Sequence, residues 1–329
     1  MKSFFSAARV AALFVGSVVG AGFATGQEIS LFFGGGSPLG PVIAAVFMGV
    51  MCFVFMEVGL PDGRARRVFD VVVAVASFVV YGAMIAAAEE VLSDLTALRG
   101  LSLLLALGSA ALTVRGAEKM AWLNLVAVPL MIAVVLVVGC RSAAPQGGGA
   151  RLLAPFAYGA MNMLFSGALM ASAGERLSRR ERVTAAVLAT VMILALLLAM
   201  YRAVAGVPRG SMPFLTAASR LDLGVLVPVT LLLAIITTMT SCNYLTACEL
   251  SRHIPDPLLP AALLPFAGVL FAQWGFAPIV DTLYPMVSVL GIVVTVIAFL
   301  CFLRGRKARS RTPCAALFTY GCRDSKCHL

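Results

Sequence analysis

Ten apolar segments follow one another along the chain, separated by short stretches rich in charged and turn-forming residues. A helix that crosses a bilayer needs about 20 consecutive apolar residues, and most of these segments meet or approach that length. The pattern predicts an all-α integral membrane protein with ten transmembrane helices. The segments are residues 4–31, 39–60, 67–93, 101–115, 119–140, 152–174, 183–204, 223–249, 258–274 and 278–303.

Composition and charge agree with this prediction and indicate how the chain is oriented. Of 329 residues, 61% are hydrophobic and 12% charged, which excludes an ordinary soluble domain. Lys and Arg concentrate in cytoplasmic loops. With both termini in the cytoplasm, only six of the 25 Lys and Arg residues fall on the outer side, so we expect this orientation, with residues 304–329 as a basic, disordered cytoplasmic tail. The six are Arg99, Arg141, Arg151, Arg202, Arg209 and Arg220.

A turn-rich linker at residues 143–149 divides the ten segments into two sets of five. An odd number of spans in each half gives the two halves opposite orientations, as in inverted-topology repeats. We therefore predict one repeat over residues 1–142 and a second, inverted repeat over residues 150–303.

The first segment contains a stretch that weakens a continuous helix. From Gly20 to Glu28 it reads Gly-Ala-Gly-Phe-Ala-Thr-Gly-Gln-Glu, although every backbone group of a single span must be bonded internally. We predict a break here, and broken helices at the membrane midplane are typical of secondary transporters. The alternative is close helix packing, because Gly16 with Gly20 and Gly22 with Gly26 form small-xxx-small pairs. By symmetry we predict a second break in the sixth segment, whose polar and flexible residues are Gly159, Asn162, Ser166, Gly167, Ser172 and Gly174.

A helix break frees backbone groups that can bind ions and solutes. Carbonyls near Gly16 and Val19 are candidates to coordinate a cation, and amides from Gly22 to Gly26 are candidates to receive a substrate carboxylate. Tyr81, midway along the third segment, either donates its phenol to that carboxylate or packs between helices. The expected substrate-binding residues are Gly20, Gly22, Phe23, Ala24, Thr25, Gly26, Tyr81, Asn162, Ser166 and Gly167.

The eighth segment carries hydroxyl groups within an aliphatic stretch, in the run Thr237-Thr-Met-Thr-Ser-Cys-Asn243. Hydroxyl oxygens on neighbouring turns can complete an oxygen shell around a hard cation such as sodium. Alternatively, these hydroxyls bond back to the preceding turn of their own helix. Together with a broken first segment, the cluster favours a cation site.

Two carboxylates are candidate coupling or gating groups. Glu28 is the deepest, and we expect it to carry a proton or pair with a cation, unless it reaches water at the outer mouth. Asp281, at the outer end of the tenth segment, is expected either in an outer gate or as an interfacial cap. With only two histidines and no nucleotide-binding motif, the sequence predicts neither an enzyme nor a nucleic-acid-binding protein, and no cofactor beyond a coupling Na⁺.

At Gly20 to Glu28 the chain resembles the YkvI-type bacterial membrane proteins. That group is similar to the amino acid, polyamine and organocation transporters with the LeuT fold. The resemblance implies helices 1 and 6 broken and a location in the bacterial plasma membrane. It also implies one sodium ion held by the carbonyls of Gly16 and Val19 and the hydroxyls of Thr237, Thr240 and Ser241. Phe23 stands where the resemblance would place a second sodium ligand, and Gly26 stands where it would place a gating arginine. We therefore expect neither a second sodium site nor that gate.

These observations lead to a functional hypothesis with two alternatives. We expect a sodium-coupled symporter of a small amino acid or related carboxylate-bearing solute, working by alternating access. In the first alternative, transport is proton-coupled through Glu28. In the second, the chain is a membrane sensor or scaffold that keeps the fold without transporting.

Overall fold

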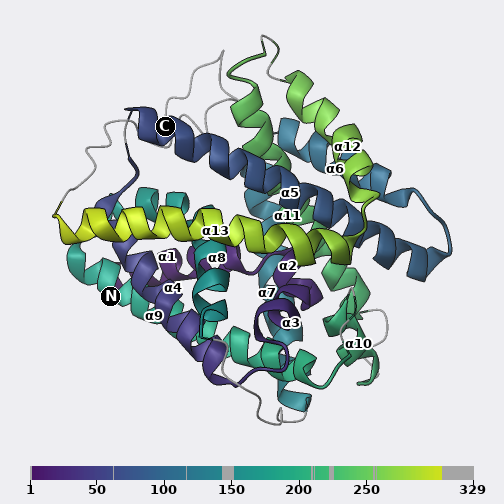
Figure 1. The fold of residues 1–329 in the computed structure, drawn as a ribbon, viewed down its shortest axis with the longest axis horizontal. Helices are drawn as coiled ribbons and strands as arrows, with labels where there is room; N and C mark the ends of the chain where they lie inside the picture. Colours follow the sequence, from purple (N-terminus) through teal and green to yellow (C-terminus); the bar gives the residue numbers. More distant parts are fainter. Residues whose placement is uncertain are drawn as a thin grey trace.

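The computed structural model describes residues 2–61, 63–115, 117–142, 152–208, 210, 212–221, 226–254, 256 and 258–305. The linker predicted at 143–149 and the tail from 306 onward lie outside these residues. Within the described part every regular element is an α-helix (Figure 1). The helices are α1 Lys2–Val18, α2 Ala21–Thr25, α3 Gln27–Phe33, α4 Leu39–Val58, α5 Gly63–Thr96, α6 Leu101–Val114, α7 Ala117–Arg141, α8 Ala154–Gly174, α9 Arg179–Ala205, α10 Pro213–Ser219, α11 Leu226–Leu250, α12 Leu258–Ala272 and α13 Phe276–Leu303.

The helices follow the predicted segments closely. The first segment corresponds to α1, α2 and α3 together, and each of the other nine corresponds to one long helix. The short helix α10 lies between two segments and was not predicted. By length and composition, α4, α5, α9, α11, α13 and residues 123–141 of α7 are apolar enough to cross a membrane. The other predicted spans are either shorter, as in α1, α6 and α12, or less apolar, as in α8.

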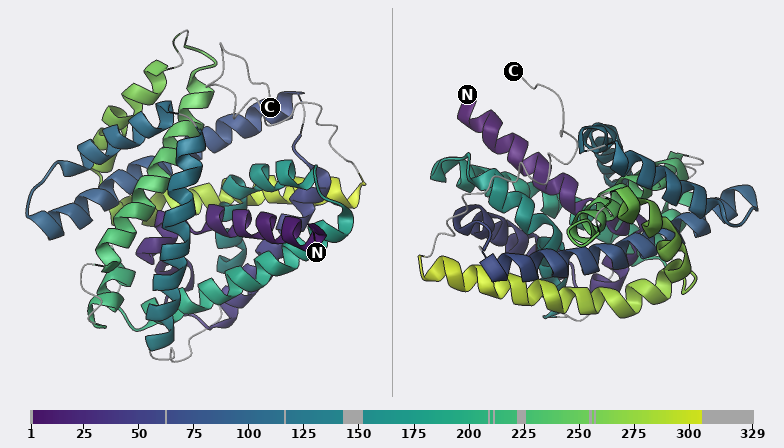
Figure 2. Two further views of the ribbon diagram at one scale, coloured as in Figure 1. Left: turned by 180° about the vertical axis from the view of Figure 1, so that it is seen from behind. Right: turned by 90° about the horizontal axis from the view of Figure 1, so that it is seen from above.

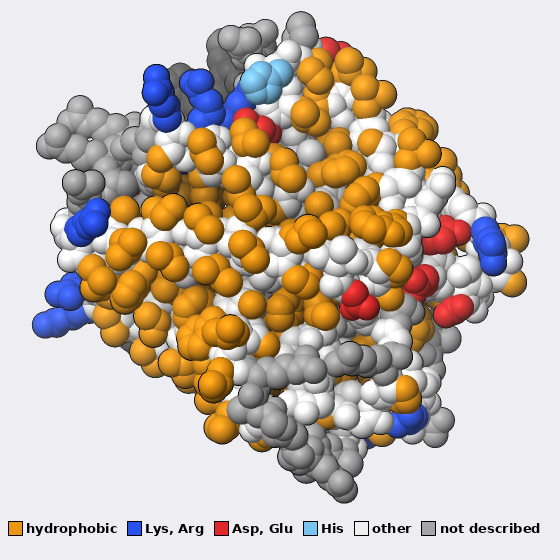
Figure 3. Space-filling model, viewed as in Figure 1, with side chains coloured by type: hydrophobic (Ala, Val, Ile, Leu, Met, Phe, Trp, Pro, Cys, Tyr) orange, Lys and Arg blue, Asp and Glu red, His pale blue; other side chains and the backbone are white. Residues whose placement is uncertain are grey.

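The outer surface agrees with a membrane location. Hydrophobic side chains cover the face shown in Figure 3, and charged side chains gather at its margins. Along α13 the exposed apolar residues recur on one side of the helix, as expected for a surface against lipid. They include Val289, Val293, Val296, Ile297 and Leu300.

Helices distant in sequence pack side by side. Helix α4 lies against α8 and α9, α5 lies against α11, and α13 lies against α8. Figure 2, seen from above, shows α13 along one side of the molecule and the N-terminal end of α1 on the opposite side. Small residues permit the close approach: Gly139 of α7 faces the backbone of Ala199, and Gly291 of α13 faces the backbone of Ala160.

Helix α8 corrects the prediction of a break in the sixth segment, because it runs without interruption from Ala154 to Gly174. Its polar side chains bond to its own backbone: Asn162 Nδ2 donates to the Tyr158 carbonyl at 3.0 Å, and Ser166 Oγ donates to the Asn162 carbonyl at 2.7 Å. Its glycines provide close packing instead of flexibility. A Cβ on Gly167 would lie 2.8 Å from the Phe55 ring of α4.

Candidate functional site

The first span is interrupted where the sequence predicted a break. Helix α1 ends at Val18, and Gly20 is extended, with φ −96° and ψ −173°. A second change of direction occurs at Gly26, whose φ of 73° is in the left-handed region that favours glycine. The Thr25 hydroxyl stabilises the intervening turn: it donates to the Gly22 carbonyl at 2.9 Å and accepts from the Gln27 amide at 3.2 Å.

Two carbonyls lose their helical partners at the interruption. The Gly20 amide donates to the Val18 carbonyl at 2.9 Å, whereas in a continuous helix it would donate to Gly16. Among the described residues no backbone amide donates to the Val19 carbonyl. The carbonyls of Gly16 and Val19 therefore keep free lone pairs, which is the condition for coordinating a cation.

The hydroxyls of α11 bond to their own helix. Thr237 donates to the Ala234 carbonyl at 2.8 Å, Thr240 to Ile236 at 2.7 Å and Ser241 to Thr237 at 3.0 Å. This is the back-bonded arrangement that the sequence left open as an alternative. Each hydroxyl oxygen keeps acceptor capacity after donating.

Thr238 is the α11 residue that faces the break, and sequence reasoning did not single it out. Its Oγ1 lies 3.2 Å from the position that a Cβ on Gly20 would occupy. Helix α11 also packs against α2. The hydroxyl cluster was a usable signal, and the packing shows that Thr238 also lies against the first span.

Tyr81 lies in a polar network away from the break. Its hydroxyl accepts from Asn243 Nδ2 at 3.3 Å and lies 3.4 Å from the Ser109 hydroxyl and 3.5 Å from the Ala106 carbonyl. These partners belong to α6 and α11. The structure therefore places Tyr81 between helices, as the alternative to a substrate contact supposed.

Glu28 lies at the break itself. It is 8% exposed, and its carboxylate folds back against Gly22 of α2, which leaves no room for a Cβ there. The alternative in which Glu28 reaches water at an outer mouth does not fit this burial. Its neighbour Gln27, also missed by sequence reasoning, donates through Nε2 to Asp281 Oδ1 at 3.4 Å and thus joins α3 to α13.

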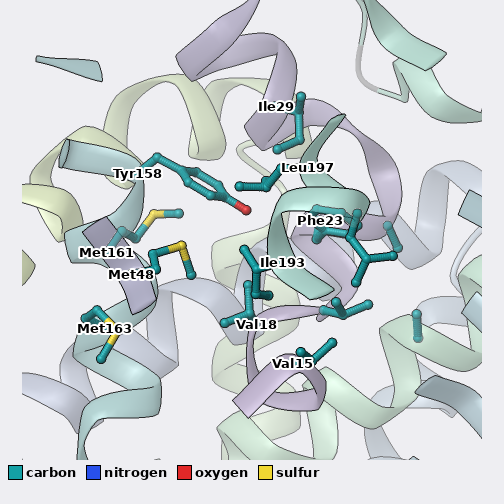
Figure 4. Close-up of a cluster of buried hydrophobic side chains, with 14 of the residues drawn as sticks. Val15, Val18, Phe23, Ile29, Met48, Tyr158, Met161, Met163, Ile193 and Leu197 are labelled. Carbon is teal, nitrogen blue, oxygen red and sulfur yellow. The ribbon is translucent and has the colours of Figure 1, made fainter. Parts of the chain in front are cut away.

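Other predicted site residues line packing contacts. Ala24 borders a narrow crevice between α2, α7, α10 and α11, whose other lining residues include Phe214 and Thr230. A Cβ on Gly26 would lie 2.7 Å from Val204 Cγ1 and 3.0 Å from Phe214 Cβ. Phe23 is fully buried among apolar side chains (Figure 4).

Comparison with solved structures identifies the fold. Mhp1 in its inward-facing conformation matches with a TM-score of 0.65 and 14% sequence identity, over 94% of this chain and 78% of that chain. Mhp1 has the LeuT fold. The present chain therefore has a LeuT-like fold.

A second Mhp1 structure matches in the same way. It is a closed conformation of this nucleobase-cation-symport-1 family transporter with bromovinylhydantoin bound, and it gives a TM-score of 0.59 and 16% identity over 96% of this chain and 80% of that chain. No protein-family model matches the sequence, and neither does any curated protein. The resemblance to YkvI-type proteins therefore stays a prediction.

Proposed function

We propose that this chain is a secondary active transporter of a small solute that works by alternating access. The observation that carries the proposal is the interrupted first span, which frees the Gly16 and Val19 carbonyls within a LeuT-like fold. Non-helical backbone at membrane depth is tolerated where it is buried in protein or lines a water-filled cavity, and transporters place such breaks at their binding sites. The comparison structures support the proposal, because they record one transporter in inward-facing and closed conformations.

We propose further that the coupling ion is sodium and that the solute is a small amino acid or a related carboxylate-bearing compound. Carbonyl oxygens of Gly16 and Val19 and hydroxyl oxygens of Thr237, Thr240 and Ser241 would supply the oxygen ligands that a hard cation requires. The bacterial plasma membrane, with both termini in the cytoplasm, is the proposed location. No step in this mechanism requires enzymatic chemistry.

Uptake into reconstituted vesicles tests the proposal. We expect an inward sodium gradient to drive accumulation of a radiolabelled amino acid, and we expect Thr240→Ala combined with Ser241→Ala to abolish that dependence. The matched control is Thr184→Ala, which removes an exposed hydroxyl that donates to its own helix at 3.0 Å. Uptake that is indifferent to sodium in the unmodified protein would reject sodium coupling.

Proton coupling through Glu28 is the second candidate, and the burial of its carboxylate at the break favours it. In this case a pH gradient drives uptake without sodium, and Glu28→Gln abolishes gradient-driven accumulation while leaving exchange of solute intact. A sensor or scaffold would instead show amino acid binding, measured as thermal stabilisation, without uptake under either gradient.

A further inference from the structure

Three buried polar side chains converge on the break from three different helices. Glu28 of α3, Tyr158 of α8 and Tyr284 of α13 are 8%, 0% and 1% exposed. Neither tyrosine hydroxyl has a hydrogen-bond partner among the described residues. Helix α3, which carries Glu28, packs against α8 and α13, the helices that carry the two tyrosines. An unpaired buried hydroxyl costs about 1–3 kcal/mol, and a bound partner that hydrogen-bonds to it would offset that cost.

The Tyr158 ring is held in a fixed orientation. Phe32 and Phe33 pack edge-on against it, with ring centroids 5.6 and 5.2 Å away. Figure 4 shows its hydroxyl pointing from α8 in among apolar side chains that include Ile193 and Leu197. The Asn162 amide, one turn further along α8, donates to the Tyr158 carbonyl at 3.0 Å.

Glu28 has no basic partner in the described part of the chain. The salt bridges found there join Arg66 and Arg252 to Asp70, Arg252 to Glu249, and Arg182 to Glu57. The other titratable groups nearby are Cys242, which acts on the Tyr284 hydroxyl, and Asp281, which precedes Tyr284 by three residues. Neither supplies positive charge. A carboxylate inside a membrane protein requires a cation or a proton to offset its burial.

We propose that Glu28, Tyr158 and Tyr284 form the binding site for the ammonium group of the transported solute. This inference rests on the proposed transport function and specifies which end of the solute the break recognises. A primary ammonium group carries one positive charge and three N–H donors. The carboxylate offsets the charge, and the carboxylate and two phenol oxygens provide three acceptors.

A metal ion fits the same groups less well. Hard cations such as Ca²⁺ take six or more oxygen ligands, whereas this site offers one carboxylate and two phenols within an aromatic and aliphatic surrounding. The apolar side chains that leave a metal ion under-coordinated are suitable neighbours for the carbon atoms of an organic ammonium compound. Aromatic faces near the site also favour an organic cation.

A hydrogen bond links α3 to α13 next to the site. Gln27 precedes Glu28 on α3 and contacts Asp281, one turn before Tyr284 on α13, at 3.4 Å. This is a long hydrogen bond between a buried and an exposed side chain.

Binding to the purified full-length protein tests the proposal with three matched sets of probes. Each set contains an amino acid (alanine, leucine or phenylalanine), the amine that lacks its carboxyl group, and the carboxylic acid that lacks its amino group. We expect at least one amine to bind and raise the melting temperature, and the corresponding acid to have no effect. Glu28→Gln should weaken amine binding at least tenfold, and Tyr158→Phe and Tyr284→Phe should each weaken it about three- to tenfold.

Stability without ligand separates binding from a structural role. If the hydroxyls are held for the solute, both Phe variants melt at or above the temperature of the unmodified protein, because each loses an unpaired buried hydroxyl. Glu175→Gln, which removes an exposed carboxylate, and Tyr201→Phe, which removes a hydroxyl bonded to the Gly36 carbonyl at 2.6 Å, are the controls and should leave amine binding unchanged.

The proposal is overturned if no amine binds, if acids bind as well as amines, or if Glu28→Gln leaves amine affinity unchanged. It is equally overturned if the Phe variants are destabilised with unaltered affinity. Failure of transport is a separate result: absence of gradient-driven uptake together with Glu28-dependent amine binding would reject the transporter proposal and retain the site. Sodium-driven uptake that persists in Glu28→Gln with the same preference for amines would reject the site and retain the transporter proposal.

Discussion

Replacement of Gly26 by alanine measures how firmly the interrupted first span is packed. Gly26 has φ 73°, and the Cβ of an alanine there would lie 2.7 Å from Val204 Cγ1, 3.0 Å from Phe214 Cβ and 3.1 Å from the Phe214 amide nitrogen. Gly35 provides a matched control. Its φ is 68°, but a Cβ there would meet nothing within 4 Å. Comparison of Gly26→Ala with Gly35→Ala thus separates the cost of backbone strain from the cost of the steric clash of the added Cβ.

The expected magnitudes follow from these two contributions. Alanine in the left-handed region costs roughly 1–2 kcal/mol, which is the whole effect at Gly35. At Gly26 the collision adds a further cost of about 1–3 kcal/mol, because Phe214 presents backbone and Cβ atoms that cannot rotate away. Gly26→Ala should therefore lower the free energy of unfolding by about 2–5 kcal/mol.

Reversible unfolding in mixed detergent micelles, followed by circular dichroism, measures both variants against the unmodified protein. The reasoning requires Gly26→Ala to lose at least about 1 kcal/mol more than Gly35→Ala. Equal losses would show that the turn between α2 and α3 does not pack against α9 and α10 in the folded protein, and the geometry of the site around Glu28 would then be wrong as well.

Three further substitutions test other parts of the structure. Gly22→Ala should leave stability nearly unchanged but weaken amine binding, because its Cβ displaces the movable Glu28 carboxylate; Gly108→Ala, whose Cβ would meet nothing within 4 Å, is the control in the same binding assay. Arg182→Met should destabilise by about 3 kcal/mol, because it leaves Glu57 unpaired and removes the donor to the Gly174 carbonyl, and adding Glu57→Leu should restore the part of the loss that is due to Glu57 in the same unfolding measurement. Tyr201→Phe should cost about 1–2 kcal/mol, measured in the same way, because the Gly36 carbonyl loses its buried donor.

Hydropathy was sufficient to predict the course of the chain. A span must be both long and apolar, so nine of the predicted segments coincide with single long helices. Helix α10 was not predicted, because seven residues are too few to span a membrane and hydropathy detects only membrane spans. The break at Gly20 was predictable, because three glycines and the polar residues Thr25, Gln27 and Glu28 fall within nine residues of an apolar segment.

The same reasoning was wrong for α8, and the cause is physical. Glycine and short polar residues weaken a helix only if they are not engaged in hydrogen bonds to the backbone or in close packing against a neighbouring helix. In α8, Asn162 and Ser166 bond to carbonyls one turn earlier, and Gly167 admits the Phe55 ring. A sequence does not reveal whether a neighbouring helix fills such positions, so composition alone could not distinguish a packed helix from a broken one.

Residues that act together across the fold were the hardest to predict. Tyr158 and Tyr284 lie on α8 and α13, and only packing brings them to Glu28. A tyrosine in an apolar segment normally reads as an interfacial or core residue. What distinguishes these two is that burial leaves their hydroxyls without partners, and that property exists only in three dimensions.

The charge distribution at the break connects the two proposed sites. The carbonyls of Gly16 and Val19 carry partial negative charge at the interruption, and the Glu28 carboxylate, which lies against Gly22, adds a full negative charge when it is ionised. A solute carboxylate approaching Gly22 would therefore meet a like charge where the amides of α2 begin. The break as a whole favours two cations, an ion at the carbonyls and an ammonium group at Glu28. A zwitterionic solute must therefore place its carboxylate away from Gly22. An amino acid ester keeps the ammonium group and lacks the carboxylate. The Gly22→Ala substitution should then reduce uptake of the ester at least as much as it reduces uptake of the parent amino acid.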